Sequence, residues 1–362
     1  MSTGGADGGT GGGVDGGTDG GVDGGWAGRF VPRGVLPPAS IAPSFGARLA
    51  PFMDWQAGCW PRLATARAGL EAVRTRELSV DGRRVLAQFN PGRAVSTTAK
   101  VDAASIQQRP CFLCPANLPD EEKGLAYGRH WVLLANPAPI LPQHFVLAHR
   151  DHRPQRARDA IPILVAFAAD TGGYASCIYN GPACGASAPD HLHLQSVQAG
   201  LLPEELAAWA VVDGAPAEGI VSGRRLRAWV VPGPGPVLLG FFGSPTVVQR
   251  ALNAAADALA MLQGEPDEPR LNLVASGRDG QVLALLFPRA AHRPACYHAP
   301  EPQRRLISPG AIDMAGLLVT VREADFESID VPLVRDIYRE TSLGMEHMAR
   351  VRDLLVRRLA HV

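Results

Sequence analysis

The sequence lacks an excess of charge, a long apolar run and an export signal. Its 35 basic and 35 acidic residues cancel, so there is no bulk electrostatic reason to expect a nucleic acid or an anionic membrane as partner. No uninterrupted apolar run reaches the roughly 18 to 20 residues of a membrane-spanning helix. The N-terminus lacks the basic-then-apolar order of a signal peptide. We therefore expect a cytoplasmic protein that binds neither membrane nor nucleic acid.

The number of cysteines and the arrangement of glycines exclude further classes of protein. Six cysteines in 362 residues are too dilute for a disulfide scaffold, and we expect reduced thiols. The glycine fingerprints of P-loop and Rossmann nucleotide sites, placed before a helix, do not occur. No basic stripe with interleaved aromatic residues indicates nucleic-acid binding.

The chain is long enough for one large or two ordinary domains, with 46% hydrophobic residues to build their cores. Residues 1–25 are rich in glycine and are predicted to be a disordered tail. Composition and periodicity divide the rest into four parts. These are a Pro-rich and helical N-terminal segment (26–76), a catalytic half (77–215), a degenerate second copy of that half (216–330) and a C-terminal segment (331–362) with a long helix over 331–359.

Local patterns predict an α+β protein rich in strands. Strands are expected at 83–90, 131–136, 144–149 and 174–179, with helices at 60–75 and 161–170. The second half repeats this order, with strands near Arg227 and Val237, a helix over 246–262, and two paired strands on either side of residues 277–280.

The segment HLHLQ stands out because a strand would place His191, His193 and Gln195 on one face. Three buried polar side chains would cost several kcal/mol unless they hydrogen-bond or bind something. The preceding GASAP loop offers backbone amides and the Ser187 hydroxyl, which are groups that bind phosphate. The alternatives are a structural or surface His-X-His pair and an ordinary tight turn.

The stretch NGPACGASAPDHLHLQ, residues 180–195, resembles the Asn-Gly, Gly-X-Ser-X-Pro, His-X-His-X-Gln signature of the histidine-triad superfamily's nucleotidyltransferase branch. That branch holds galactose-1-phosphate uridylyltransferase, diadenosine tetraphosphate phosphorylase and GDP-hexose phosphorylase. QFNPGR (88–93) and NPAPILPQHFVLAHRDH (136–152) resemble further segments of the branch. The resemblance implies a histidine-triad-like fold with two related strand-rich halves, an antiparallel sheet and flanking helices.

The resemblance also implies roles for individual residues. His193 would attack the α-phosphorus and become a covalent nucleotidyl-histidine, Gln195 would donate its amide to a phosphoryl oxygen, and Ser187 would bind a phosphate. Because glutamine cannot give up a proton as histidine can, phosphates are the expected leaving groups. Further candidates for substrate binding are Asn136, Asn180, Gln88, Asn90, Arg93 and Arg289, with Arg293 as another anion clamp; each arginine has the alternative reading of a solvated surface charge.

The expected substrates are a nucleoside diphosphate sugar or a dinucleoside polyphosphate, with phosphate or a sugar phosphate as second substrate. No organic cofactor is expected, and members of this branch are often homodimers. Two alternatives stay open, namely a nucleotide hydrolase of the same superfamily and a catalytically silent, zinc-stabilised module that binds nucleotides.

A structural zinc site is also expected. Cys111-X-X-Cys114 supplies half of a tetrahedral set, and the resemblance to the uridylyltransferases implies His152 and His191 as the other two ligands. His144 is an alternative ligand, and two buried thiols without metal are the other alternative. Asp190 is a departure, because the uridylyltransferase pattern runs directly from proline to histidine.

Overall fold

The structure is a computed structural model that describes residues 25–36, 44–94, 103–223, 225–232 and 235–359. The tail predicted over 1–25 falls outside these ranges apart from Gly25. Among the helices of the described ranges, none is both long and apolar enough to cross a bilayer.

Helices and antiparallel strands are mixed along the chain, which confirms the α+β class. The α-helices of the described residues are α1 (Leu49–Cys59), α2 (Pro61–Ala68), α4 (Ala103–Gln108), α5 (Ala157–Thr171), α6 (Pro203–Val212), α7 (Pro245–Gln263), α8 (Ala295–His298), α9 (Ala311–Met314), α10 (Glu323–Ser328), α11 (Val331–Thr341) and α12 (Met345–Leu359). The strands are β1 (Arg74–Val80), β2 (Arg83–Phe89), β3 (Leu125–Tyr127), β4 (Trp131–Ala135), β5 (His144–His149), β6 (Ala175–Asn180), β7 (His193–Gln198), β8 (Glu218–Ser222), β9 (Leu226–Val231), β10 (Leu238–Gly243), β11 (Leu271–Arg278), β12 (Gln281–Pro288) and β13 (Leu317–Thr320).

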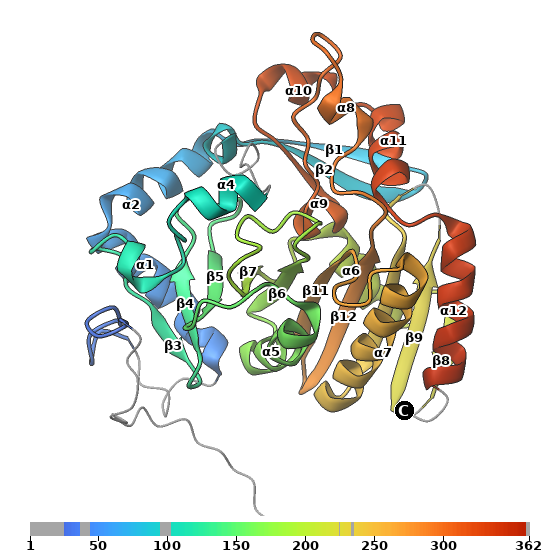
Figure 1. Ribbon diagram of the computed structural model, residues 1–362, viewed down its shortest axis with the longest axis horizontal. Helices are drawn as coiled ribbons and strands as arrows, with labels where there is room; N and C mark the ends of the chain where they lie inside the picture. The colour runs from blue at the N-terminus through green and yellow to red at the C-terminus, as the bar shows by residue number, and fades with distance from the viewer. Residues whose placement is uncertain (1–24, 37–43, 95–102, 224, 233–234, 360–362) are drawn as a thin grey trace, which may run out of the picture.

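One sheet holds ten of the described strands, in the order β3-β4-β5-β7-β6-β11-β12-β10-β9-β8. Its two central blocks mirror each other, because β4-β5-β7-β6 is matched by β9-β10-β12-β11. Each block also inserts one helix between its second and third strand in chain order, α5 in the first and α7 in the second. The blocks meet where β6 pairs with β11 (Figure 1). Two related halves are therefore present, and their boundaries at 77–215 and 216–330 stay a prediction.

Alternation along the strands separates two layers of packing. On β6, Ala175, Cys177 and Tyr179 belong to a core cluster that also takes in buried residues of α1, α5, α7 and α12. Ile178, on the opposite face, belongs to a second cluster with residues of α6, α9 and α11. In Figure 1, α5 and α7 lie side by side in front of the sheet, and α12 stands at the β8 edge.

A smaller sheet of β1, β2 and β13 covers part of that second face. The β1–β2 turn consists of Asp81 and Gly82, both with positive φ, as a two-residue hairpin turn requires. β13 pairs parallel to β2. The predicted strand at 83–90 is therefore present as β2 but lies outside the ten-stranded sheet, because its second partner comes from a segment more than 220 residues later.

Three predicted elements need correction. The helix expected over 60–75 ends as α2 at Ala68, and β1 follows. The strand expected from His191 begins at His193. The helix expected over 331–359 is broken in two, because Ser342 forms a bridge with Arg289 and the Leu343 N–H donates to the Pro288 carbonyl. That segment extends the end of β12 and so leaves the helical conformation.

Candidate functional site

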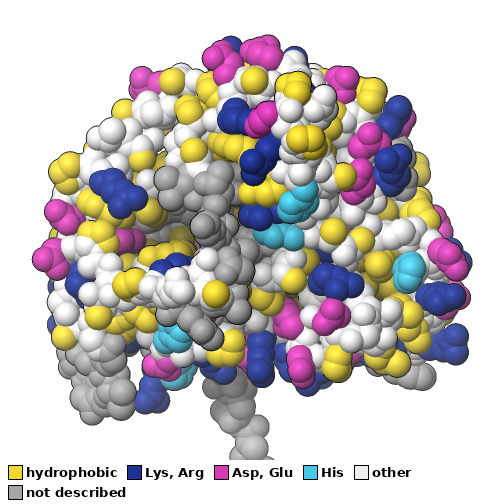
Figure 2. Space-filling model, turned by 45° about the horizontal axis from the view of Figure 1, so that its top comes forward, with side chains coloured by type: hydrophobic (Ala, Val, Ile, Leu, Met, Phe, Trp, Pro, Cys, Tyr) yellow, Lys and Arg dark blue, Asp and Glu magenta, His cyan; other side chains and the backbone are white. Residues whose placement is uncertain are grey.

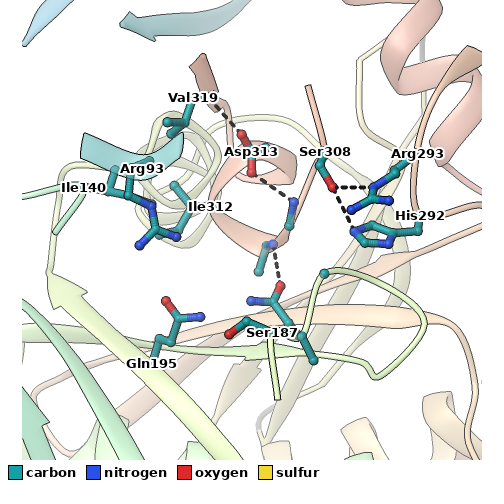
Figure 3. Close-up of a pocket in the computed structure, with 15 residues that line it drawn as sticks. Arg93, Ile140, Ser187, Gln195, His292, Arg293, Ser308, Ile312, Asp313 and Val319 are labelled. Carbon is teal, nitrogen blue, oxygen red and sulfur yellow. Dashed lines mark hydrogen bonds between the residues drawn. The ribbon is translucent and has the colours of Figure 1, made fainter. Parts of the chain in front are cut away.

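A polar cavity opens on the second face of the sheet, where the two halves meet. Its lining includes four residues or segments of the first half, namely Arg93, Asn180, the loop 185–187 and Gln195. The opposite wall comes from the C-terminal part of the chain, and its polar and helical members are His292, Arg293, Ser308 and residues 310–313. Figure 3 shows Gln195 and Ser187 facing Arg93, Asp313, Ser308 and His292 across the cavity. Basic and histidine side chains also lie together near the centre of the face in Figure 2.

The orientation of Gln195 follows from His144 on the neighbouring strand. Burial lowers the pKa of His144 to about 3, so its ring is neutral. Its Nδ1 accepts from the Ile140 N–H at 3.1 Å, which leaves the proton on Nε2. That N–H donates to Gln195 Oε1 at 2.7 Å. The Gln195 amide nitrogen is thereby directed away from His144 as a donor for the cavity, and His144 is not a metal ligand.

His193 lies on the same face of β7 as Gln195. Its Nδ1 donates to the His191 carbonyl at 2.8 Å, which fixes the tautomer with a free lone pair on Nε2. Among the described residues, none hydrogen-bonds to this Nε2. Burial lowers the pKa of the imidazole, which favours the neutral, nucleophilic ring. The side chain is 3% exposed and is not itself part of the cavity lining.

The end of β6 and the loop after it carry Asn180 and Ser187, which both line the cavity. Asn180 Oδ1 accepts from Asn272 Nδ2 at 2.9 Å and from the Ala311 N–H at 2.7 Å. Its amide nitrogen therefore remains as a donor. Gly185 has φ of +104°, and a Cβ there would come within 3.1 Å of the Gly310 Cα. A glycine is required where the two walls approach this closely.

Three residues expected to bind substrate do not line the cavity. Gln88 donates to the Ile140 carbonyl, Asn90 donates to the Pro139 carbonyl, and Asn136 Oδ1 accepts from the Ala138 N–H. All three are buried and contact the loop between β4 and β5 through these hydrogen bonds. Arg93 also donates to this loop, at the Ala138 carbonyl, but it does line the cavity.

Arg289 is a second correction. The side chain is 0% exposed and donates to the carbonyls of Thr341, Pro309, Ala291 and His292 and to Asn272 Oδ1. Its donors thus tie the C-terminal segment to β11, and it is absent from the cavity lining. An arginine with its donors engaged by the protein holds the wall in place and does not clamp a substrate anion.

The opposite wall supplies Arg293, predicted from the sequence as an anion clamp, and further polar residues that were not predicted. Arg293 Nε donates to Ser308 Oγ at 3.1 Å, and this hydroxyl lies 3.0 Å from His292 Nε2. Burial, and then the nearby Arg293, lower the pKa of His292 to about 4. Burial raises the pKa of Asp313 to about 6, against bonds from the Val319 and Gly310 N–H groups. Only the fold shows that residues of the segments 287–297 and 308–319 line the same cavity as Gln195 of β7.

Arg93 supplies a lasting positive charge to the cavity. Burial lowers the pKa of its guanidinium to about 10, and the nearby Asp313 acts in the opposite direction. The group is therefore protonated at neutral pH. Together with Arg293 it gives the cavity the electrostatic character of an anion site.

The four expected metal ligands come together. The ligand atoms of Cys111, Cys114, His152 and His191 all lie within 4.8 Å of one another. Cys111 Sγ is 3.2 Å from His191 Nδ1, and Cys114 Sγ is 3.3 Å from His152 Nδ1. Ideal tetrahedral zinc–sulfur and zinc–nitrogen bonds separate such atoms by about 3.6 Å. A Cys2His2 set of this spacing fits a tetrahedral metal ion.

The surroundings of this Cys2His2 cluster also suit a metal. His191 Nε2 donates to the His149 carbonyl at 2.7 Å, which leaves Nδ1 as the ligand atom and fixes the ring. Burial, and then the neighbouring Cys111, raise the pKa of the Cys114 thiol to about 12. A bound cation would lower that pKa by stabilising the thiolates. His191 leads directly to His193, so the cluster adjoins the proposed nucleophile.

Asp190, the residue that departs from the uridylyltransferase pattern, links this cluster to the cavity loop. Its carboxylate lies 3.7 Å from His152 Nε2 and 3.5 Å from an Arg109 amino group. Arg109 also donates to the Ser187 carbonyl at 2.9 Å. The extra residue therefore joins the metal cluster to the loop that carries Ser187.

Comparisons with known proteins support the fold. A domain family of unknown function (DUF4922) matches residues 52–198, a stretch that runs from α1 to the end of β7. No curated protein matches the sequence. Among solved structures, yeast Ap4A phosphorylase Apa2 superposes with a TM-score of 0.53 at 13% identity, covering 81% of this chain and 97% of that one.

Two further structures show the range of similarity. The complex of the yeast enzyme with Ap4A gives a TM-score of 0.52 at 14% identity, covering 80% of this chain and 97% of that one. An ADP-glucose phosphorylase from Arabidopsis thaliana with bound ADP-glucose gives 0.37 at 13% identity, covering 72% and 99%. The matches to the yeast enzyme establish the histidine-triad-like fold expected from the sequence, and at these identities they establish the fold alone.

Proposed function

We propose that the protein is a nucleotidyltransferase of the phosphorylase type, which carries a nucleoside monophosphate on His193 between two phosphate groups. The single observation that carries this proposal is the pairing on β7: His193 with its Nδ1 bound to the His191 carbonyl, and Gln195 with its oxygen bound to His144. One side chain offers a lone pair, and the other offers an amide donor. The yeast structure with the same fold is an Ap4A phosphorylase, which supports this class of chemistry.

In the first step, His193 Nε2 attacks the α-phosphorus of the nucleotide and forms an N–P bond. The P–O bond to the leaving phosphate or phosphate ester breaks, and the leaving oxygen takes the electron pair without needing a proton, because phosphates are weak bases. The Nδ1–H keeps its bond to the His191 carbonyl and stabilises the charged ring. Gln195 Nε2 donates to a phosphoryl oxygen whose charge grows in the transition state.

In the second step, an oxygen of the second phosphate attacks the same phosphorus and the N–P bond breaks. The opposite wall supplies Arg293, Ser308 and His292 for this anion, and Arg93 of the first half adds a further positive charge. Ser187 and the Asn180 amide would bind the phosphate on the β6 side. The substrate is a nucleoside diphosphate sugar or a dinucleoside polyphosphate, and phosphate or a sugar phosphate is the acceptor.

We also propose zinc as the ion held by Cys111, Cys114, His152 and His191. Two thiolates and two imidazoles in a closed tetrahedral set are typical of structural zinc. When bound, the ion would supply rigidity and no reaction chemistry. The residues of the chain then do the work: His191 holds its carbonyl at the His193 Nδ1, and Asp190 holds the neighbouring loop.

The test is intact-protein mass spectrometry after incubation with UDP-glucose, GDP-glucose, GDP-mannose, ADP-glucose or diadenosine tetraphosphate, at neutral to alkaline pH because phosphoramidates are labile in acid. We expect the mass of one nucleoside monophosphate to be added to the protein and to the control variant His347→Ala, whose histidine is exposed on α12. The variant His193→Ala should gain nothing.

The fate of the adduct distinguishes the alternatives. Discharge on addition of phosphate or a sugar phosphate supports a phosphorylase or transferase. Discharge in buffer alone would instead support the hydrolase. No adduct with any of the five nucleotides, together with measurable nucleotide binding, would support the catalytically silent module.

A further inference from the structure

Gln155 is a buried residue, 2% exposed, that no motif singles out. It lies in the extended segment between β5 and α5, three residues after His152. Its backbone N–H donates to the Pro189 carbonyl at 3.0 Å, and the Leu192 N–H donates to the Arg153 carbonyl at 2.6 Å. The segment therefore runs beside residues 189–192, the approach to β7.

The side chain of Gln155 hydrogen-bonds to both the backbone N–H and the backbone carbonyl of His193. The His193 N–H donates to Gln155 Oε1 at 2.8 Å, and Gln155 Nε2 donates to the His193 carbonyl at 2.9 Å. The same Nε2 also donates to the Asn180 carbonyl at 3.0 Å. Both donor hydrogens and the acceptor oxygen of the amide are thus in use, which fixes its orientation.

These hydrogen bonds lie where the pairing between β6 and β7 ends. β6 and β7 pair from Ala175 with Gln198 as far as Ile178 with Gln195. Two residues further along each strand, the same register would set Asn180 opposite His193. The side-chain amide of Gln155 takes the place of that pair, so the strands part between the proposed nucleophile His193 and the cavity-lining Asn180.

We propose that Gln155 is a positioning residue: its amide, inserted between β6 and β7, holds His193 apart from Asn180 and sets the place from which the imidazole reaches the nucleotide. The part that concerns the reaction rests on the proposed function, whereas the clamp itself does not. Parting the strands also leaves room for residues 181–192, including Ser187, to leave β6 and return to β7.

The decisive variant is Gln155→Glu, which keeps the shape of the side chain. A carboxylate can still accept from the His193 N–H but cannot donate to the two carbonyls, which it repels. The chain offers a matched control in Gln56, which is 0% exposed and also bridges backbone groups, donating to the Glu121 carbonyl and accepting from the Lys123 N–H. Gln56→Glu therefore buries the same charge away from the cavity. Gln198→Glu makes the same change at an exposed position of β7.

The primary readout is the rate of nucleotidyl-His193 formation per folded molecule, with nucleotide affinity measured on the same variants. We expect Gln155→Glu to slow adduct formation at least 100-fold while nucleotide affinity changes less than 5-fold. Gln56→Glu should lose comparable thermal stability yet keep a rate within 3-fold of the unmodified protein, as should Gln198→Glu. Equal rates in Gln155→Glu and Gln56→Glu would overturn the positioning role.

Hydrogen exchange separates failure of this inference from failure of the proposed function. The His193 amide is protected by Gln155 Oε1 and should exchange at least 10-fold faster in Gln155→Leu but not in Gln56→Leu. If the unmodified protein forms no adduct, the proposed function fails and this exchange result alone decides the clamp. Unchanged protection of the His193 amide in Gln155→Leu would overturn it.

Discussion

The two halves of the sheet share a strand order but not a chemistry. In the first half, β7 carries His193 and Gln195 on the face toward the cavity. In the second half, the corresponding strand β12 carries Leu285 and Phe287, which are buried in the core cluster on that face. Gln195 pairs with Ile178, Ile178 pairs with Val274, and Val274 pairs with Leu285, so Gln195 and Leu285 occupy matching places in one row across the sheet.

This comparison shows how one topology serves two purposes. The first half places Gln195, a proposed catalytic residue, in this row and carries the Cys2His2 cluster near the start of the same strand. The second half fills the row with apolar side chains and contributes its polar groups from the segments after β12. The cavity therefore needs both halves, although only the first carries the proposed nucleophile His193.

Loss of the metal cluster should have the largest effect. Cys111→Ser combined with Cys114→Ser should abolish binding of one zinc ion per chain, measured by elemental analysis, and lower the free energy of unfolding by at least about 4 kcal/mol, because metal binding contributes directly to folding. Cys59→Ser is the control, since this cysteine is exposed and does not belong to the cluster. Unchanged metal content in the double variant would contradict the assignment of the ligands.

The row across the sheet gives the next prediction. Gln195→Leu should reduce the rate of adduct formation by about 10²- to 10³-fold, the usual cost of removing one donor to the transition state. Leu285→Ala in the matching place should instead cost about 2 to 5 kcal/mol of stability, with little change in rate per folded molecule. Single-turnover rates and urea unfolding check the pair. A rate loss in Leu285→Ala as large as that in Gln195→Leu would remove the distinction between the halves.

The opposite wall gives a smaller effect, confined to the second step. Arg293→Ala should raise the phosphate concentration needed for half-maximal discharge of the adduct by about 10- to 100-fold, since a hydrogen bond to a charged group contributes about 1.5 to 3 kcal/mol. Formation of the adduct should be nearly unchanged. Arg129→Ala, at an exposed turn of the first half, is the matched control. If Arg293→Ala slows formation and discharge equally, this wall does not serve the second phosphate.

Much of this arrangement can be predicted from the sequence, because the strands and the Cys-X-X-Cys pair depend on local spacing, while His152 and His191 follow from the resemblance to the uridylyltransferases. A few neighbouring residues are enough to recognise the alternation in HLHLQ, the two central helices and the Cys-X-X-Cys pair. Long-range pairing is not visible in this way, which is why the sequence predicts the strand 83–90 but not its pairing with β13, and predicts one helix where α11 and α12 are separate.

The roles of polar residues were harder to predict than their positions. Arg289, Gln88, Asn90 and Asn136 belong to types that bind nucleotides, yet each makes hydrogen bonds to backbone groups of the protein. Conversely, Gln155 and the wall residues His292 and Ser308 have no motif around them. Whether a polar side chain serves the fold or the substrate depends on which carbonyls lie nearby, and only tertiary structure fixes that.

The joint between the halves should respond weakly to pH through Glu268, which precedes β11 but caps α5 of the first half. Its carboxylate accepts from the Ala157 N–H and, at 2.8 Å, from the Tyr179 hydroxyl. Burial raises its pKa to about 7, from 4.5. The folded protein therefore holds this proton more tightly than the unfolded chain, and stability due to this group falls as pH rises from about 4.5 to 7.

As pH rises through that window, we expect the unmodified protein to lose about 1 to 2 kcal/mol of unfolding free energy relative to Glu268→Gln. The change is this small because Glu268 is only partly buried. Urea unfolding at pH 5, 6, 7 and 8 measures it, and Glu265→Gln in the same loop should show no such trend. A change in the opposite direction would mean that the N-terminus of α5 stabilises the carboxylate more than burial penalises it. The joint would then be held by the charged form of Glu268, and the halves would separate more readily in acid than at neutral pH.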